Sequence, residues 1–210
     1  MSRLSDNDIN KVSSEEWRKE SWESAKKESE IEKKNKKNQI IREIVIYLII
    51  LFLCIKIIPT YVIQHTIVDG PSMENTLQDQ DHLFVEKITY HFDRLDRFDV
   101  IAFYPYGKDV NEYYIKRIIG MPGETVQIKG SDIYINGEIL EENYGKDPIT
   151  YAGIASEPIV LGEDEYFVLG DNRTVSLDSR DESIGAVNKS DIGGKAILRI
   201  WPLDKFGTIK

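Results

Sequence analysis

The chain has 210 residues and carries 27 Lys and Arg against 36 Asp and Glu, for a formal net charge of −9 at pH 7. This length allows one domain of ordinary size with shorter segments beside it. The negative charge argues against a general nucleic-acid binder. A single cysteine excludes an intramolecular disulfide framework and a cysteine-based zinc site, and three scattered histidines argue against a His-rich metal centre. The sequence therefore predicts no metal and no cofactor.

Residues 1–43 are polar and very highly charged, with 11 Lys/Arg and 10 Asp/Glu. Because few apolar side chains are available for burial, this segment is expected to be either disordered or a solvated helix. The basic residues crowd towards its end, at 33–42. A nucleic-acid-binding arm is the alternative interpretation of that cluster.

An apolar segment follows at residues 44–63, with the sequence IVIYLIILFLCIKIIPTYVI. Twenty helical residues extend about 30 Å, the thickness of a bilayer core. The competing interpretation is a buried core helix, because Lys56 interrupts the run. The segment has no polar face of the kind that a surface helix needs, and Lys56 lies near enough to the far end to reach the headgroups. We therefore predict a transmembrane anchor over 44–63.

A cleavable signal peptide is the other alternative for this segment. Its charged N-terminal region would be far too long, and no small-x-small cleavage site follows, because residues 64–68 are bulky. The basic cluster on the N-terminal flank predicts that residues 1–43 lie in the cytoplasm. The expected protein is therefore a single-pass protein of the cell membrane whose residues 64–210 lie outside the cell.

Residues 64–210 have the pattern of a β-rich domain. Alternation of apolar and polar residues over 128–140, around Asn136-Gly137, predicts a β-hairpin. Short strand-like runs occur at 100–104, 113–115 and 196–201, and long helical periodicity is absent. The fold class expected is mainly β, an open or closed barrel or a sandwich, preceded by one transmembrane helix.

Three stretches are dense in polar residues and turn formers, at 68–77, 114–124 and 170–180. Ser72 follows Gly-Pro at a predicted turn, where one residue can supply both a nucleophile and an amide donor. Lys116 and Arg117 point to opposite faces of a strand, so that one can be buried while the other meets solvent. Burial lowers the pKa of a lysine, which suits it as a general base. The alternative interpretation is that the three stretches have a structural role only, as a capped turn, an edge strand and a well-capped loop.

No histidine or acidic partner for Ser72 is evident in these stretches. A Ser/Lys pair needs none, because one neutral amine takes the serine proton and later returns it to the leaving group. Acyl transfer by Ser72 and Lys116 is therefore the chemistry that the residues favour first.

The same stretches closely resemble the motif boxes of bacterial type I signal peptidases, in order and in spacing. The resemblance covers about residues 40–205, and its single span is similar to the single-anchor form common in Gram-positive bacteria. The matching residues are Gly70-x-Ser72-Met73-x-x-Thr76-Leu77, Asp96-Arg97-Phe98-Asp99-Val100, Tyr114-x-Lys116-Arg117-x-x-Gly120-x-Pro122-Gly123 and Gly170-Asp171-Asn172-Arg173-x-x-Ser176-x-Asp178-Ser179-Arg180.

This resemblance implies Ser72 as nucleophile and Lys116 as general base. It implies supporting roles for Ser176, which would hydrogen-bond the lysine, for an Asp178–Arg180 ion pair, and for Gly70 beside the oxyanion hole. The small apolar substrate pockets would be lined by Val68, Leu77 and Ile115.

The implied activity is that of a serine endopeptidase that removes signal peptides from exported precursors after small residues at −1 and −3. Its partners would be those precursors, the lipid bilayer and a secretion translocon, with no nucleic acid. The implied fold is a β-rich catalytic core with a small inserted β subdomain at about 125–165. The chain departs from the family at Asn75, where proline is usual, which frees φ at one turn residue.

Two other functions compete. A repressor-type Ser–Lys peptidase would be soluble and carry a DNA-binding module, and the predicted span and acidic outer domain oppose both. A non-catalytic homologue that assists assembly, for example of surface fibres, would be expected to lack Ser72 or Lys116, and both are present.

Overall fold

The computed structural model describes residues 6–57, 61–88, 95–110 and 112–209. Its contacts divide the chain into two compact units, one that ends at Ile55 and one that begins at Lys56. Residues 1–5 of the expected tail and 58–60 of the expected span lie outside the described residues.

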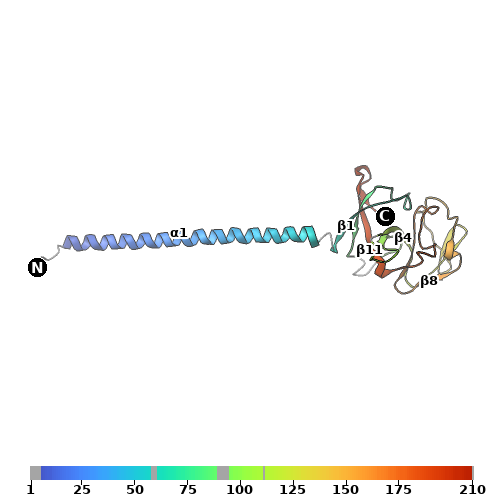
Figure 1. Ribbon diagram of the computed structural model, residues 1–210, viewed down its shortest axis with the longest axis horizontal. Helices are drawn as coiled ribbons and strands as arrows, with labels where there is room; N and C mark the ends of the chain where they lie inside the picture. The colour runs from blue at the N-terminus through green and yellow to red at the C-terminus, as the bar shows by residue number, and fades with distance from the viewer. Residues whose placement is uncertain (1–5, 58–60, 89–94, 111, 210) are drawn as a thin grey trace. The chain divides into compact units, whose positions relative to one another are not determined.

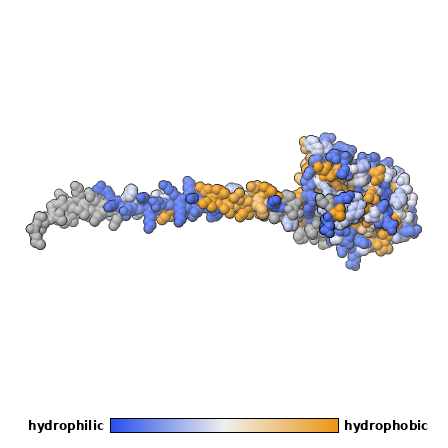
Figure 2. All heavy atoms as spheres, viewed as in Figure 1, coloured by the Kyte–Doolittle hydropathy of each residue, from blue (hydrophilic) through white to orange (hydrophobic). Residues whose placement is uncertain are grey.

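The first unit is a long helix. α1 spans Asp6–Phe52, and a π-helical turn at Leu53–Ile57 follows it (Figure 1). Along the described part of this helix, charged side chains come first and apolar side chains follow towards its C-terminal end (Figure 2). Within Trp17–Lys56 an 18-residue window has a mean hydropathy of 2.0, and none of that window is buried. By length and composition this helix can cross a membrane.

The second unit is built on an eight-stranded sheet in which every pairing is antiparallel. The order is β1-β2-β11-β3-β4-β9-β10, and β12 pairs with β11. The strands are β1 Ile63–Ile67, β2 His82–Glu86, β3 Val100–Phe103, β4 Tyr114–Gly120, β9 Glu165–Leu169, β10 Val187–Asn188, β11 Ile192–Trp201 and β12 Gly207–Thr208. Short 3₁₀ turns lie at Gly153–Ser156, Lys189–Asp191 and Leu203–Lys205.

A smaller sheet of four strands has the order β7-β6-β5-β8. Its strands are β5 Thr125–Lys129, β6 Asp132–Ile135, β7 Glu138–Ile139 and β8 Ile159–Val160. The predicted hairpin is confirmed: β6 and β7 pair around Asn136 and Gly137, whose φ angles of 53° and 86° are those that an Asn-Gly turn tolerates. This sheet lies within the segment expected to form an inserted subdomain.

Buried apolar side chains form three clusters. One joins the smaller sheet to the larger one, with Val126 and Ile128 against Phe167 and Leu169. A second lies under the loop that follows β1, and the third packs β3 against β4 and β9. The central strand β4 is buried from Ile115 to Gly120, which explains why its sequence reads as an apolar run around two charges. The mainly β fold with one apolar N-terminal helix is as predicted.

Candidate active site

Ser72 lies in the loop between β1 and β2, residues 68–81, called here the serine loop. The Leu77 N–H donates to Met73 O at 2.8 Å, so that a single tight turn closed by this bond follows the serine directly. Met73 and Leu77 are both buried and anchor this turn in the core. Ser72 itself is half-buried at the surface of the anchored turn.

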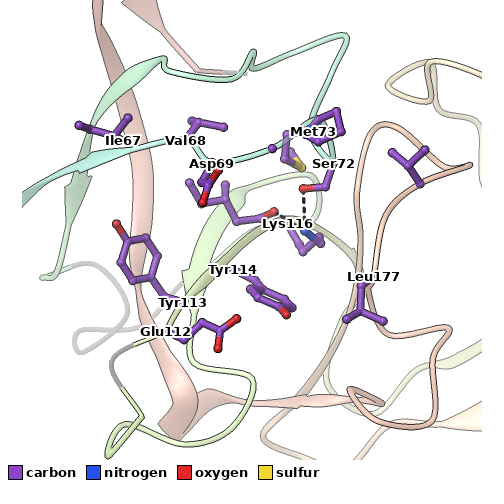
Figure 3. Close-up of a pocket in the computed structure, with 14 residues that line it drawn as sticks. Ile67, Val68, Asp69, Ser72, Met73, Glu112, Tyr113, Tyr114, Lys116 and Leu177 are labelled. Carbon is purple, nitrogen blue, oxygen red and sulfur yellow. Dashed lines mark hydrogen bonds between the residues drawn. The ribbon is translucent and has the colours of Figure 1, made fainter.

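Lys116 reaches Ser72 from the middle of β4. Its Nζ donates to Ser72 Oγ at 2.9 Å and to Ile115 O at 3.0 Å (Figure 3). The residue is only 3% exposed. Burial lowers the pKa of Lys116 from 10.5 to about 8, and the nearby carboxylates of Asp178 and Asp171 limit that fall. At pH 7 about a tenth of this amine is therefore neutral, against a far smaller fraction for an ordinary lysine. The neutral form faces a hydroxyl whose proton it can accept.

The two side chains open into a cavity of about 420 Å³. Two of the three expected pocket residues, Val68 and Ile115, line it. Leu77, the third, is fully buried in the core beneath the serine loop and is not among the residues that line this cavity. Val175 and Leu177, which fill unspecified positions of the last quoted motif, also line the cavity. Leu177 lies across it from Val68 (Figure 3).

The loop after β9 contacts the backbone of the serine. Asp178 and Arg180 form the expected ion pair, with Nε to Oδ1 at 2.8 Å and Nη2 to Oδ2 at 2.9 Å, and both are buried. Asp178 also accepts the Gly170 N–H at 3.0 Å. The Asn172 N–H donates to Ser72 O at 3.0 Å. The ion pair thus fixes a loop that touches the backbone of the serine.

Ser176 differs from the expectation. Its Oγ is buried and has no hydrogen-bond partner among the described residues, so the expected bond to Lys116 is not formed. The lysine donates to the carbonyl of its own neighbour, Ile115, instead. Ser176 packs against Gly170, where a Cβ would overlap its hydroxyl.

Arg117 is also buried, at 0% exposure, so neither of the two adjacent cations meets solvent. Its guanidinium pairs with Asp171, with Nε to Oδ1 at 2.9 Å and Nη2 to Oδ2 at 2.7 Å, and it donates to Thr76 Oγ1 at 2.9 Å. The Tyr144 ring covers it at 3.7 Å from the ring centroid. Sequence reasoning missed this second buried ion pair, although both partners stand in the quoted motifs.

Gly70 has φ of +87°, in the region that favours glycine, and its N–H donates to Asp79 Oδ1 at 2.9 Å. That amide is therefore already engaged. Among the described residues no hydrogen bond occupies the Ser72 N–H, so this donor is available to an oxygen of a bound ligand. Among the residues that the structure describes, no group of three or more His, Cys, Asp or Glu side chains is placed so that it could hold a metal ion.

A serine hydroxyl and a buried amine meet in the cleft of a β domain, which is an arrangement that acyl-transfer chemistry can use. The sequence profile of the family described as "Signal peptidase, peptidase S26" matches residues 39–201. On this evidence the chain belongs to the signal peptidase family, peptidase S26, and is a peptidase.

Several known proteins are similar to this chain. Signal peptidase I of Leptolyngbya laminosa is 41% identical over 158 residues, which cover 72% of this chain and 75% of that protein. Signal peptidase I P of Bacillus subtilis subsp. natto is 36% identical over 183 residues, which cover 83% and 95%. The crystal structure of a signal peptidase I from Enterococcus faecalis is 34% identical, covers 49% of this chain and 97% of that one, and superposes with a TM-score of 0.40.

Proposed function

We propose that the chain is a type I signal peptidase that uses Ser72 and Lys116 as a catalytic dyad. It would remove N-terminal signal peptides from exported precursors after small residues at −1 and −3. The observation that carries this proposal is the 2.9 Å contact between Lys116 Nζ and Ser72 Oγ, made by a lysine that is 3% exposed.

The chemistry runs in two halves. Neutral Lys116 takes the Ser72 proton as Oγ attacks the scissile carbonyl carbon, and the Ser72 N–H donates to the oxygen that becomes negative. The lysine ammonium then protonates the leaving amine, which departs with the mature chain and leaves an ester on Oγ. A water that gives its proton to Lys116 attacks that ester. Return of the proton to Oγ releases the signal peptide and restores the dyad.

Specificity follows from the walls of the cavity. Apolar side chains of Val68 and Ile115 line it on the side of the serine loop and β4, and the pocket offers about 420 Å³ in total. Such walls favour apolar side chains at the positions that face them. Alanine at −1 and −3 fits this description.

The membrane arrangement is part of the same proposal. The apolar end of α1 anchors the chain in the lipid bilayer with a single span, and the Lys/Arg cluster at 33–42 holds residues 1–43 in the cytoplasm. The β domain then lies outside the cell, where the precursor emerges from a translocon. No nucleic acid takes part.

The test uses the full chain in lipid vesicles with a precursor that carries an Ala-x-Ala site. Cleavage after the second alanine, mapped by the mass of the mature product, is the expected result. Replacement of the −1 alanine by phenylalanine should abolish it. A full-length chain that leaves the Ala-x-Ala precursor intact would contradict the proposal and favour the assembly role.

A further inference from the structure

Two of the three histidines in the sequence meet on the folded domain. His65 lies on β1 and His82 on β2, and these strands are antiparallel neighbours. Because Ile67 is the residue opposite His82, the two histidines are diagonal neighbours, close enough for their rings to touch. His65 Nε2 and His82 Nδ1 lie 3.0 Å apart. We call these two residues the histidine pair.

The histidine pair lies on the solvent side of its strands. Thr66 and Leu83, the next residues along β1 and β2, are buried, and alternation along a strand therefore directs the two histidines away from the core. His65 is exposed and His82 is half-buried. An ion in solution can therefore reach the facing nitrogens.

The separation of these nitrogens suits a shared metal ion. Imidazole nitrogens bind such ions at about 2.0–2.1 Å, so two nitrogens 3.0 Å apart enclose an angle of roughly 95° at the ion. A near-right angle between adjacent ligands is typical of the tetragonal sites of Cu²⁺ and Ni²⁺, and imidazole is a ligand that both ions favour. A tetrahedral Zn²⁺ site needs nitrogens about 3.3 Å apart. The geometry therefore favours Cu²⁺ and Ni²⁺ over Zn²⁺.

Binding of the ion requires a change of tautomer and a rotation of the rings. In the hydrogen bond of the histidine pair, one facing nitrogen carries a proton and the other accepts it. When the proton of His65 is on Nδ1 and that of His82 is on Nε2, both facing nitrogens present a lone pair. The ion then exchanges two of its water ligands for the two neutral rings. Among the described residues no third His, Cys, Asp or Glu side chain completes the site, so water keeps the remaining positions.

The histidine pair stands at the base of the serine loop. His82 directly follows this loop, and His65 lies three residues before it. The two ends of the loop are already joined by hydrogen bonds, from the Val68 N–H to Asp81 O at 2.9 Å and from the Gln80 N–H to Val68 O at 2.9 Å. An ion shared by the histidine pair adds a link beside these bonds. Since a ligand stabilises the state that binds it, the ion should oppose opening of the loop.

We propose that the histidine pair is a binding site for a divalent transition-metal ion of the Cu²⁺ or Ni²⁺ type, and that the bound ion holds the two ends of the serine loop together. The site does not depend on the reaction that Ser72 carries out. Mg²⁺, which prefers oxygen ligands, should not bind there.

The first experiment measures Ni²⁺ binding by calorimetry. It uses the full-length chain without an affinity tag, in detergent micelles and a non-coordinating buffer. A Cys54→Ser background removes the exposed thiol, which would compete for the ion. One Ni²⁺ per chain is expected, and Mg²⁺ should give no heat of binding. A chain that binds no Ni²⁺ at millimolar concentration would overturn the proposal and leave a hydrogen bond as the only role of the contact.

Substitution of single histidines locates the bound ion. Loss of a residue that merely supports a ligand costs about 10–100-fold in metal affinity, so loss of a ligand, in His65→Ala or His82→Ala, should weaken Ni²⁺ binding by about tenfold or more. The matched control is His91→Ala, which changes the remaining histidine of the sequence and should leave the affinity unchanged. Equal affinity in wild type and His65→Ala would show that the ion binds elsewhere. Circular dichroism of each variant verifies that it is folded.

Amide hydrogen exchange tests the link to the serine loop. With free Ni²⁺ at 100 times Kd, exchange through opening of residues 68–81 should slow by up to about 100-fold. Exchange at β5 and β6 should not change, and neither segment should respond to Ni²⁺ in His65→Ala. Binding without protection of residues 68–81 would refute the effect on the loop. None of these readouts uses a precursor, so a chain that cleaves nothing but binds Ni²⁺ through the histidine pair would contradict the proposed function alone.

Discussion

Lys116 Nζ lies 2.9 Å from Ser72 Oγ, and the lysine residue is 3% exposed. A charged ammonium in this position loses most of its hydration, so the protein favours the neutral amine more than water does. The serine and the lysine come from different elements, the serine loop and β4, which the sheet brings together.

The pH dependence of the reaction follows from that burial. The pKa of Lys116 is lowered to about 8, and the neutral form is the one that accepts a proton. We expect kcat to fall about tenfold for each pH unit below that value and to level off above it. A rate that is flat down to pH 6 would contradict Lys116 as the general base.

The Asp178 carboxylate raises the pKa of Lys116, so its removal should lower that pKa further. In Asp178→Asn the midpoint of the acid limb of kcat should move to lower pH, measured on protein that is still folded. Asp204→Asn, at an exposed position of the last 3₁₀ turn, is the matched control and should leave the midpoint unchanged. A shift to higher pH in Asp178→Asn would refute this electrostatic account.

Burial of Lys116 also has a cost in stability. Because the folded-state pKa falls from 10.5 to about 8, the unfolded chain holds this proton more tightly. At pH 7, Lys116→Met should therefore raise the free energy of unfolding by up to about 3 kcal/mol. This gain should shrink between pH 8 and 10.5, as both states of the wild type lose the proton. Urea unfolding at pH 7 and pH 10 measures it, and a variant less stable than wild type at pH 7 would be inconsistent with it.

Close packing under the serine predicts the effect of a single methyl group. A Cβ at Gly170 would overlap Ser176 Oγ and lie 2.5 Å from Ser72 O. A backbone oxygen can move only together with the residue that carries it. Gly170→Ala should therefore displace Ser72 and reduce kcat at least tenfold. Gly207→Ala, where no atom lies within 4 Å of the new Cβ, should leave kcat and stability near wild type. Comparable activity in the two variants would show that the packing is looser than described.

The buried pair of Arg117 and Asp171 should behave as a unit. Both side chains are fully buried, so Arg117→Met leaves a carboxylate with no counter-charge and should cost about 3–5 kcal/mol of stability. The double variant Arg117→Met/Asp171→Leu removes both charges and should recover part of this loss. The urea unfolding midpoints of the two variants measure this recovery. A double variant less stable than Arg117→Met alone would show that the loss in the single variant does not come from an uncompensated Asp171 charge.

The sequence predicted the parts of this protein that local patterns determine. Apolar composition identified the helix that can cross a membrane, and Asn136-Gly137 identified a hairpin that the structure contains. The motifs singled out Ser72 and Lys116, and the structure brings them into contact.

The sequence did not predict the features that arise from contacts between segments distant in the chain. Alternation along β4 placed Lys116 and Arg117 on opposite faces but could not show that Tyr144, from a distant segment, covers the second face. The family resemblance implied Leu77 as a substrate-pocket residue, whereas the turn after Ser72 directs its side chain into the core. Leu177 was overlooked because it fills an unspecified position in its motif, and only the folded loop places it at the cavity.

The central claim is that Ser72 and Lys116 act together on a peptide bond, and one comparison tests it most directly. Wild type, Ser72→Ala and Lys116→Ala are assayed side by side on the lipid-embedded Ala-x-Ala precursor, with folding of each verified by circular dichroism. The account predicts specific cleavage by wild type and none by either folded variant. Cleavage that survives Lys116→Ala would mean that another group removes the serine proton, and would contradict the dyad.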